Sequence, residues 1–137
     1  MKSLAALGIA SASLVSLITL APPASAADGW CSTTTSVWKS NGRFIHPATS
    51  SGSTSCLMGP GSSGPQVAEL QRALTICQGL DTGGVDGVYG RKTEAAVKTV
   101  QARRSLKVDG IYGPDTNLFA IMWRYYWNDG QVTCSWQ

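Results

Sequence analysis

The sequence predicts a mostly α fold, a bundle of three helices joined by two equivalent loops. The first observation behind this prediction is a repeated loop, because VDGVYG at residues 85–90 returns as VDGIYG at residues 108–113. The second is that each copy runs on to a threonine in the same place, Thr93 or Thr116, which makes an eight-residue DGxxGxxT pattern. The third is the helical spacing of apolar residues before, between and after the two loops.

The first helix is predicted to begin at Pro65 and to end before Gly79. Proline suits the first helical position because its missing N–H needs no partner there, and glycine commonly follows a helix end. One face of this helix carries the apolar residues Val67, Leu70, Leu74 and Cys77.

The second helix is predicted over residues 91–104 and the third from Pro114 onward. The inward side of the second helix consists of Ala96, Val97 and Val100, and the apolar stripe of the third consists of Leu118, Ile121, Met122 and Tyr125. Beside that stripe the third helix would also carry the aromatic residues Trp123, Tyr126 and Trp127. These rings would either form an exposed strip that suits sugar stacking or, the account we prefer, be buried by the C-terminal tail.

Each repeated loop is predicted to launch the helix that follows it. Its aspartate, Asp86 or Asp109, can accept backbone N–H groups across the turn that it starts. A glycine follows in each copy and permits a backbone conformation that a Cβ would obstruct. Gln71 and Gln101 stand at matching points of the first and second helices, so we expect these amides to tie the loops to the helices rather than to bind ligand.

Residues 1–26 are predicted to be a secretory signal peptide. Lys2 precedes an apolar stretch over residues 4–20, and Ala24-Ser25-Ala26 supplies the small residues of a cleavage site. An uncleaved membrane anchor is the alternative, which the cleavage pattern disfavours. No other apolar run is long enough to span a bilayer, so we expect no membrane contact after cleavage and a secreted, extracellular or cell-wall-associated protein.

The net charge of the chain is small. The chain has 11 basic and 8 acidic side chains and a net charge of +3 at pH 7, and Lys2 would leave with the signal peptide. This charge is too small to favour nucleic acid, although it is compatible with a mildly anionic partner. The length of 137 residues predicts one domain, and we expect a monomer.

Four cysteines, Cys31, Cys56, Cys77 and Cys134, predict two disulfides because an exported protein meets an oxidising environment. Three pairings are open from the sequence, and Cys31–Cys56 with Cys77–Cys134 is favoured since each bridge then closes a compact unit. Zinc is the alternative use of four cysteines. No C-x-x-C spacing occurs and His46 is the only histidine, so we predict no metal site and no cofactor.

The mature chain divides into three predicted parts. Residues 27–56 form a Ser/Thr-rich, cystine-containing segment in which Asn41-Gly42, between β-forming residues, predicts a β-hairpin. Residues 57–127 hold the helices and loops. Residues 128–137 are a tail that the second disulfide would tie back.

Three segments of the middle part resemble a known family: GSSGPQVAELQRAL (61–74), VDGVYGRKTEAAVKTVQ (85–101) and LKVDGIYGPDT (106–116). In order and spacing they are similar to the small three-helix peptidoglycan-binding domain found beside bacterial cell-wall hydrolases and amidases. The resemblance implies a peptidoglycan-binding-domain-like bundle and a noncatalytic module that attaches a secreted protein to bacterial cell wall. The family's usual catalytic partner domain is not expected here, and the cysteines are an addition to its pattern.

The chemistry-bearing residues favour binding over catalysis. Glycan cleavage needs two carboxylates about 5 to 10 Å apart, and the acidic residues here fall in turns or at polar helix positions. One histidine cannot build a zinc amidase site, and a cysteine peptidase needs a free thiol. We therefore predict that the protein is not an enzyme. A small cell-wall hydrolase and a protein-binding or inhibitor module are the alternatives.

The candidate ligand-binding residues are aromatic or basic and lie in or near the loops and the second helix: Tyr89, Arg91, Lys92, Arg103, Lys107 and Tyr112. Sugar faces stack on aromatic rings, and stem-peptide carboxylates pair with Arg or Lys. For the two tyrosines we prefer the alternative in which the rings pack inward, and the basic residues could equally be solubilising charge. The expected partner is peptidoglycan, through its glycan or its stem peptides.

Overall fold

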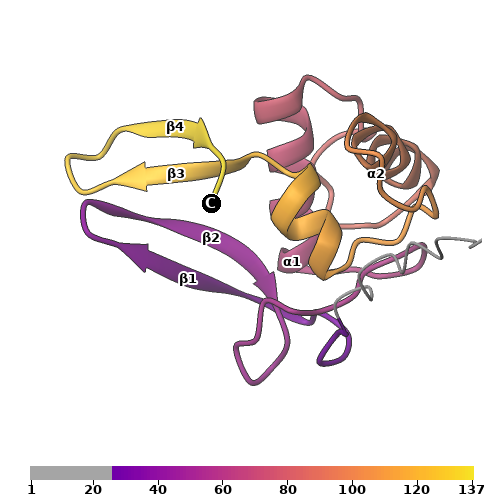
Figure 1. Cartoon of the computed structure of the whole chain (residues 1–137), viewed down its shortest axis with the longest axis horizontal. Coiled ribbons are helices and arrows are strands. Elements are labelled where there is room, and N and C mark those ends of the chain that lie inside the picture. Colours follow the sequence, from indigo (N-terminus) through magenta and orange to yellow (C-terminus); the bar gives the residue numbers. More distant parts are fainter. Residues whose placement is uncertain (1–25) are drawn as a thin grey trace, which may run out of the picture.

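The computed structural model describes residues 26–137, and the predicted signal peptide lies outside them apart from Ala26. Four strands form one antiparallel sheet in the order β1-β2-β3-β4. The strands are β1 (Thr33–Lys39), β2 (Gly42–Ala48), β3 (Trp123–Trp127) and β4 (Val132–Ser135). The helices are α1 (Pro65–Arg72), η1 (Ala73–Cys77), α2 (Arg91–Arg103) and η2 (Thr116–Ala120). The two hairpins lie side by side on one side of the molecule, and the helices lie on the other (Figure 1).

The first two predicted helices are present. α1 begins at Pro65, and η1 continues it as one wider, π-helical turn. Gly79 follows with a φ of 66°, the left-handed conformation that ends many helices. α2 begins after Gly90, which is the residue predicted to precede it.

The predicted fold class, a mostly α three-helix bundle, is wrong because the third helix ends early. It stops at Ala120, after which the backbone is extended, and residues 123–127 form β3 instead. Aromatic residues favour strands, and burial alternates along this segment, with Trp123 and Tyr125 buried and their neighbours partly or fully exposed. The structure is therefore a four-stranded sheet packed with short helices.

The exposed strip of Trp123, Tyr126 and Trp127, the alternative that we did not prefer, does not form, because alternate residues of a strand point to opposite faces. Trp123 lies in the core, 6.2 Å from the ring of Tyr112 in an edge-on arrangement. Tyr126 lies on the other face of the sheet and is partly exposed. The tail does not cover the rings; it forms β4 and pairs with the edge of β3.

The predicted N-terminal hairpin is confirmed, but its turn lies one residue earlier. Lys39 pairs with Gly42, so Ser40 and Asn41 form the turn, and neither has a positive φ. Gly42 belongs to β2, where a Cβ would collide with the backbone oxygen of Tyr126 and the neighbouring tyrosine ring of β3. This glycine therefore serves the close approach of β2 to β3 rather than the turn.

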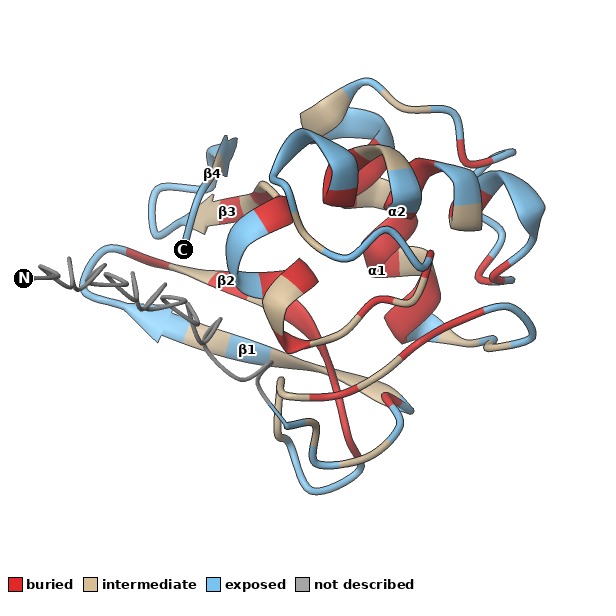
Figure 2. Cartoon of the chain, turned by 45° about the vertical axis from the view of Figure 1, so that its right-hand side comes forward, coloured by how far each residue is buried: buried red, intermediate tan, exposed pale blue. Residues whose placement is uncertain are grey.

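One hydrophobic core joins the sheet to the helices, as the buried residues in both parts show (Figure 2). Phe44 and Trp123 of the sheet belong to the same cluster as Leu70 and Val97 of the helices. His46 is fully buried 4.6 Å from the Trp123 ring, and this burial lowers the pKa of His46 to about 4. The ring is therefore neutral at neutral pH. Within residues 26–137 every helix is too short or too polar to cross a membrane.

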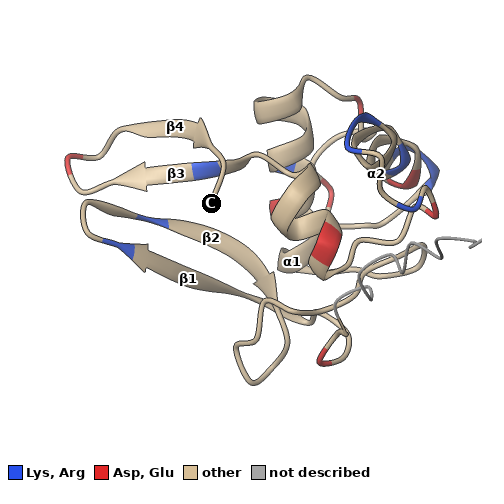
Figure 3. Cartoon of the chain, viewed as in Figure 1, with Lys and Arg blue, Asp and Glu red and all other residues tan. Residues whose placement is uncertain are grey.

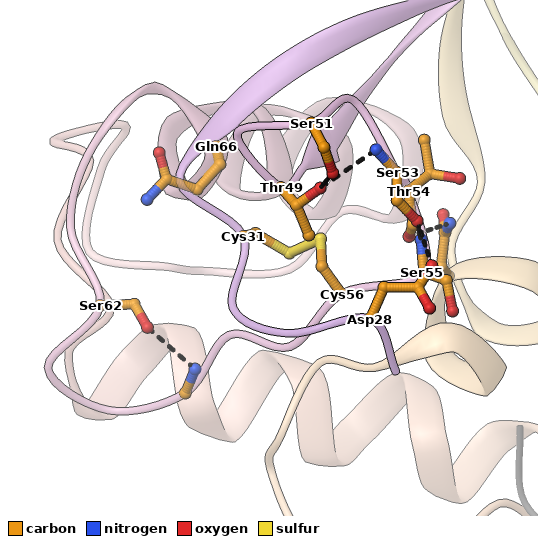
Figure 4. Close-up of a disulfide and its surroundings, with 12 residues drawn as sticks. Asp28, Cys31, Thr49, Ser51, Ser53, Thr54, Ser55, Cys56, Ser62 and Gln66 are labelled. Carbon is orange, nitrogen blue, oxygen red and sulfur yellow. Dashed lines mark hydrogen bonds between the residues drawn. A yellow bond between two sulfur atoms is a disulfide. The ribbon is translucent and has the colours of Figure 1, made fainter. Parts of the chain in front are cut away.

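The favoured disulfide pairing is confirmed: Cys31 bonds to Cys56, and Cys77 bonds to Cys134. The first bridge connects the entry of β1 to the segment after β2 and lies beside a serine-rich loop (Figure 4). There Ser53 donates from its hydroxyl to a carboxylate oxygen of Asp28 at 2.6 Å. The second bridge fastens the end of η1 to β4 and closes a long segment, for which chain-entropy estimates give about 4 kcal/mol of stabilisation.

An ion pair makes a further connection between helix and sheet. The carboxylate of Glu69 in α1 is buried and lies 3.0 Å from a guanidinium nitrogen of Arg124 in β3. A second guanidinium, that of Arg72, lies 3.3 Å from the same carboxylate. Because a buried carboxylate needs such partners, α1 and β3 are held in one relative position.

Candidate functional site

The first repeated loop is organised by one buried side-chain amide. The amide nitrogen of Gln71 donates to a carboxylate oxygen of Asp86 at 2.9 Å, to the carbonyl of Val88 at 3.0 Å and to the hydroxyl of Thr93 at 3.1 Å. Its amide oxygen accepts the backbone N–H of Gly87 at 2.9 Å. All four contacts lie in or next to the loop, so α1 is fastened to the loop that precedes α2.

The second loop repeats this arrangement with the amide of Gln101. Its nitrogen donates to Asp109 at 3.0 Å, to the carbonyl of Ile111 at 2.9 Å and to the hydroxyl of Thr116 at 3.1 Å. Its oxygen accepts the N–H of Gly110 at 3.0 Å. The prediction that the two glutamines tie loops to helices is therefore confirmed.

The two aspartates close their turns as predicted. Asp86 accepts the N–H of Val88 at 3.0 Å, and Asp109 accepts the N–H of Ile111 at 2.9 Å. The N–H of Val88, followed by the glutamine amide, lowers the pKa of the Asp86 carboxyl. In both loops the glycine after the aspartate has a φ of 72°, which a side chain rarely adopts.

Tyr89 and Tyr112 lie inside the molecule. Their exposed fractions are 1% and 0%, and the Tyr89 hydroxyl donates to the carbonyl of Gly110 at 2.7 Å. Burial raises the pKa of both phenols. The inward packing that we preferred for these rings is what the structure has, and neither ring offers a face to solvent.

A groove lies beside the second loop and has a volume of about 230 Å³. We call it the loop groove and define it by Leu57, Gln101, Leu106, Lys107, Asp109, Ile111, Gly113, Pro114, Asp115 and Thr116. Aliphatic side chains supply its apolar part, and one lysine and two aspartates supply its charges. Such a mixture can hold the apolar face of a small molecule and pair with a charged group at its edge.

Lys107 is the predicted ligand-binding residue that lies at the loop groove. Its side chain is 87% exposed, and its ammonium lies 3.9 Å from a carboxylate oxygen of Asp109. An ion pair at this distance and exposure is weak. The ammonium can therefore exchange this partner for the anionic group of a ligand at little cost.

The other predicted basic residues lie elsewhere. Arg91 and Lys92 begin α2 and Arg103 ends it, and a helix of 13 residues is about 20 Å long. Lys92 pairs with Asp81 at 2.9 Å, and Arg103 lines a separate hollow near the C-terminus. Figure 3 shows the basic residues distributed along α2 and over three strands of the sheet, so the structure does not gather them into one cluster.

The prediction missed the aliphatic side chains of the loop groove, Leu57, Leu106 and Ile111. A signal for two of them was present, because Leu106 and Ile111 flank Lys107 and the second aspartate along the chain. Leu57 carries no such signal, since only the fold brings it to the loop. In residues 26–137 no group of three His, Cys, Asp or Glu side chains lies close enough to hold a metal ion.

The region that contains the two loops matches a known protein family. The family described as "Putative peptidoglycan binding domain" matches residues 63–117. An N-acetylmuramoyl-L-alanine amidase of Bacillus licheniformis, CwlL, is 46% identical over 69 residues, which are 49% of this chain and 19% of the amidase. A spore cortex-lytic enzyme of Bacillus cereus is 41% identical over 61 residues, 44% of this chain and 23% of that enzyme. The chain thus spans only about a fifth of the length of these curated relatives.

Solved structures give similar matches. The SleB N-terminal domain is 40% identical, and the match covers 45% of this chain and 84% of that domain with a TM-score of 0.43. A peptidoglycan-binding protein from Clostridioides difficile, solved in complex with glutamine hydroxamate, is 29% identical over 61% of this chain and 53% of that chain, with a TM-score of 0.47. The four strands of the sheet lie outside the family match.

Proposed function

Because residues 63–117 of this chain belong to the peptidoglycan-binding domain family, we propose that the protein is a secreted, monomeric, noncatalytic protein that binds bacterial cell wall. The observation that carries the proposal is the loop groove, which combines aliphatic walls with an exposed lysine whose ion pair is weak. Secretion is supported by the predicted signal peptide and by the two disulfides, which form in oxidising compartments.

The loop groove suits a stem peptide better than a sugar ring. Its volume of about 230 Å³ has room for one or two small residues, and none of its lining residues is aromatic. Stem peptides carry methyl groups, which pack on Leu57, Leu106 and Ile111, and carboxylates, which pair with Lys107. We therefore assign the ligand of this groove to the peptide part of the wall.

The six predicted ligand-binding residues take different roles in this proposal. Lys107 contacts the ligand directly. Arg91, Lys92 and Arg103 attract the anionic wall over longer distances, an effect that salt screens. The two buried tyrosines keep the loops in shape from inside.

Pull-down of the mature protein, residues 27–137, with insoluble cell-wall sacculi tests the proposal. We expect the protein to sediment with the sacculi at low salt, and Lys107→Glu to weaken binding about tenfold, because one charge-assisted contact becomes a repulsion. Lys92→Glu makes the same charge change at the far end of α2 and should weaken binding far less. Equal losses in both variants would point to general charge attraction, and recovery of all protein in the supernatant would refute the proposal.

The noncatalytic part of the proposal needs its own test, since the loop groove contains two carboxylates, Asp109 and Asp115. Asp109 accepts the bonds of its own loop with one oxygen, and its other oxygen lies 3.9 Å from the ammonium of Lys107. Asp115 is the less engaged of the two carboxylates and is the one to test first. The turbidity of a sacculus suspension should stay constant when the protein is added. Clearing that the Asp115→Asn variant abolishes would instead establish the alternative, a small cell-wall hydrolase.

A further inference from the structure

A row of three large side chains crosses the sheet outside the family match. Trp38 of β1 is directly opposite Arg43 of β2, and Arg43 is directly opposite Tyr126 of β3. Residues opposite each other in neighbouring strands have side chains on the same face. The opposite face of these strands carries Phe44 and Tyr125 and is buried in the core. The row therefore lies on the outer face of the sheet.

The guanidinium of Arg43 is held by aromatic rings and not by an acid. Its central carbon lies 5.0 Å from the ring centroid of Trp38 and 5.9 Å from that of Tyr126, within the range of cation–π attraction. Within residues 26–137 it forms no ion pair, and its buried Nε has no hydrogen-bond partner. Arg124 on the same face differs, because Glu69 neutralises it. Arg43 is thus a cation that two aromatic rings hold in position and that no carboxylate of residues 26–137 pairs with.

These side chains border a pocket of about 320 Å³ at the far end of the sheet. We call it the sheet pocket and define it by Trp38, Arg43, Tyr126, Trp127, Asn128, Gly130 and Gln131. The indole of Trp38 is 64% exposed. In the described part of the chain, Asn128 and Gln131 form hydrogen bonds through their backbone only, so both side-chain amides are available.

We propose that the sheet pocket binds an acidic sugar. The apolar face of a pyranose ring would stack on the Trp38 indole, as amphipathic rings do on exposed aromatic side chains. The carboxylate of the sugar would pair with the guanidinium of Arg43, whose planar donors match carboxylate geometry. The amides of Asn128 and Gln131 would bond its hydroxyl and acetamido groups. The volume is that of a site for one ring.

The source of the ligand rests on the proposed function. In a bacterial wall the sugar that carries a carboxylate is N-acetylmuramic acid, whose lactyl group is an amide wherever a stem peptide is attached. Hydrolysis of that amide adds one water, breaks the C–N bond, and leaves a carboxylate on the sugar and an ammonium on the peptide. The sheet pocket would therefore bind glycan from which amide hydrolysis has removed the peptides, whereas the loop groove would bind the peptides themselves.

Titration of the isotope-labelled mature protein with N-acetylmuramic acid and with N-acetylglucosamine, followed by NMR, tests the proposal. The two sugars share the ring and the acetamido group and differ by the lactyl carboxylate. We expect the muramic sugar to shift the indole N–H of Trp38 and to bind about tenfold more tightly, because one charge-assisted pair is added. Arg43→Gln should reduce its affinity to that of N-acetylglucosamine, and Trp38→Ala should abolish both.

Two further variants separate binding from folding. Trp30→Ala removes a second indole, 62% exposed, that lies outside the sheet pocket, and should leave the titration unchanged. Asn128→Ala keeps the backbone bond from Asn128 to Asn41 and should still weaken sugar binding several-fold. An Asn128→Ala variant that folds and binds like the parent would overturn the proposal even if Arg43→Gln fails to fold.

Each of the remaining outcomes would refute either this inference or the proposed function. Equal affinity for both sugars, or shifts confined to residues outside the sheet pocket, would overturn the proposal. If glycerol 3-phosphate shifts the NMR signals of Arg43 and neither sugar shifts any signal, the sheet pocket is a phosphate site instead. Sacculus binding that survives with no response to the muramic sugar would refute this inference alone. A response to the sugar without sacculus binding would refute the proposed function and leave the sheet pocket standing.

Discussion

The first loop, residues 85–90, and the second loop, residues 108–113, are each held by the same four contacts of a glutamine, yet they meet different neighbours. The carbonyl of Gly87 in the first accepts the N–H of Gly64 at 2.8 Å, which fastens it to the start of α1. The carbonyl of Gly110 in the second accepts the hydroxyl of Tyr89. Backbone bonds hold both loops at their tyrosines, Tyr89 to Ser62 and Tyr112 to Met58. The loops differ at the glycine carbonyl, which is bonded to backbone in the first loop and to a side chain of the first loop in the second.

The difference explains why only the second loop borders the loop groove. A Cβ at Gly113 would lie 3.2 Å from the Leu57 side chain, whereas a Cβ at the equivalent Gly90 would meet nothing within 4 Å. Leu57 therefore lies against the second loop, and within residues 26–137 no side chain lies as close to the equivalent glycine of the first. The hydrogen bonds make the loop, and the residues around it decide whether a ligand can lie there.

The largest effect should come from removing either glutamine. Gln71→Ala and Gln101→Ala should each lower the free energy of unfolding by about 3 kcal/mol, since each leaves several buried loop groups without partners. Urea denaturation measures both losses. If the bonds alone make the loops, the two losses should agree to within about 1 kcal/mol.

A third glutamine supplies the control for that comparison. Gln78 follows η1, and its amide makes a single bond, to the carbonyl of Ala120 at 2.8 Å. Gln78→Ala should cost about 1 kcal/mol. A loss at Gln71 or Gln101 no larger than this would show that the loops are held chiefly by their other contacts.

The sequence could predict the loops because their bonds are local and occur twice. The glutamine bonds span 8 to 22 residues, and each copy of the pattern confirmed the interpretation of the other. The position of Lys107 beside the second loop could be predicted for the same reason, because it directly precedes that loop in the sequence. The position of Leu57 could not, since it reaches the loop groove only through the packing of the N-terminal segment.

The sheet could not be predicted in the same way because its contacts are remote. The hydroxyl of Tyr125 donates to the side chain of Asn41 at 2.7 Å across 84 residues of chain. Residues 123–127 satisfy a helical stripe as well as a strand alternation, and only pairing with β2 decides between them. The sheet pocket depends on that pairing, so its residues could not be recognised as neighbours from the sequence.

An effect of intermediate size is expected when the glycine after the aspartate is replaced by alanine, and the loss of stability should differ between the two loops. Alanine at a φ of 72° costs about 1 to 2 kcal/mol in either loop. At Gly87 the new Cβ would also lie 3.1 Å from the backbone oxygen of Gly64, which cannot move without disturbing α1. At Gly110 it would meet the side chains of Glu94 and Lys98, which can swing away. Gly87→Ala should therefore be the more destabilising variant in thermal denaturation.

The background variant Glu94→Ala sharpens this test. It removes the contact at 2.7 Å that a Cβ at Gly110 would make and leaves the contact with Lys98 at 2.9 Å, so the cost of Gly110→Ala should fall toward the cost of the backbone conformation. Gly87→Ala should cost the same with or without Glu94. A Gly110→Ala variant that loses more stability than Gly87→Ala would contradict the claim that the backbone of Gly64 makes Gly87 the tighter position.

The smallest effect should have opposite signs in the two loops. The Tyr89 hydroxyl donates to the carbonyl of Gly110 at 2.7 Å, while the buried hydroxyl of Tyr112 has no partner in residues 26–137. Tyr89→Phe should therefore lower the free energy of unfolding by about 1 kcal/mol, because the carbonyl of Gly110 loses its donor. Tyr112→Phe should leave it unchanged or raise it slightly, because a polar atom leaves an apolar site. Urea denaturation of both variants side by side decides the matter: equal losses would mean that the first loop does not support the second through this hydroxyl.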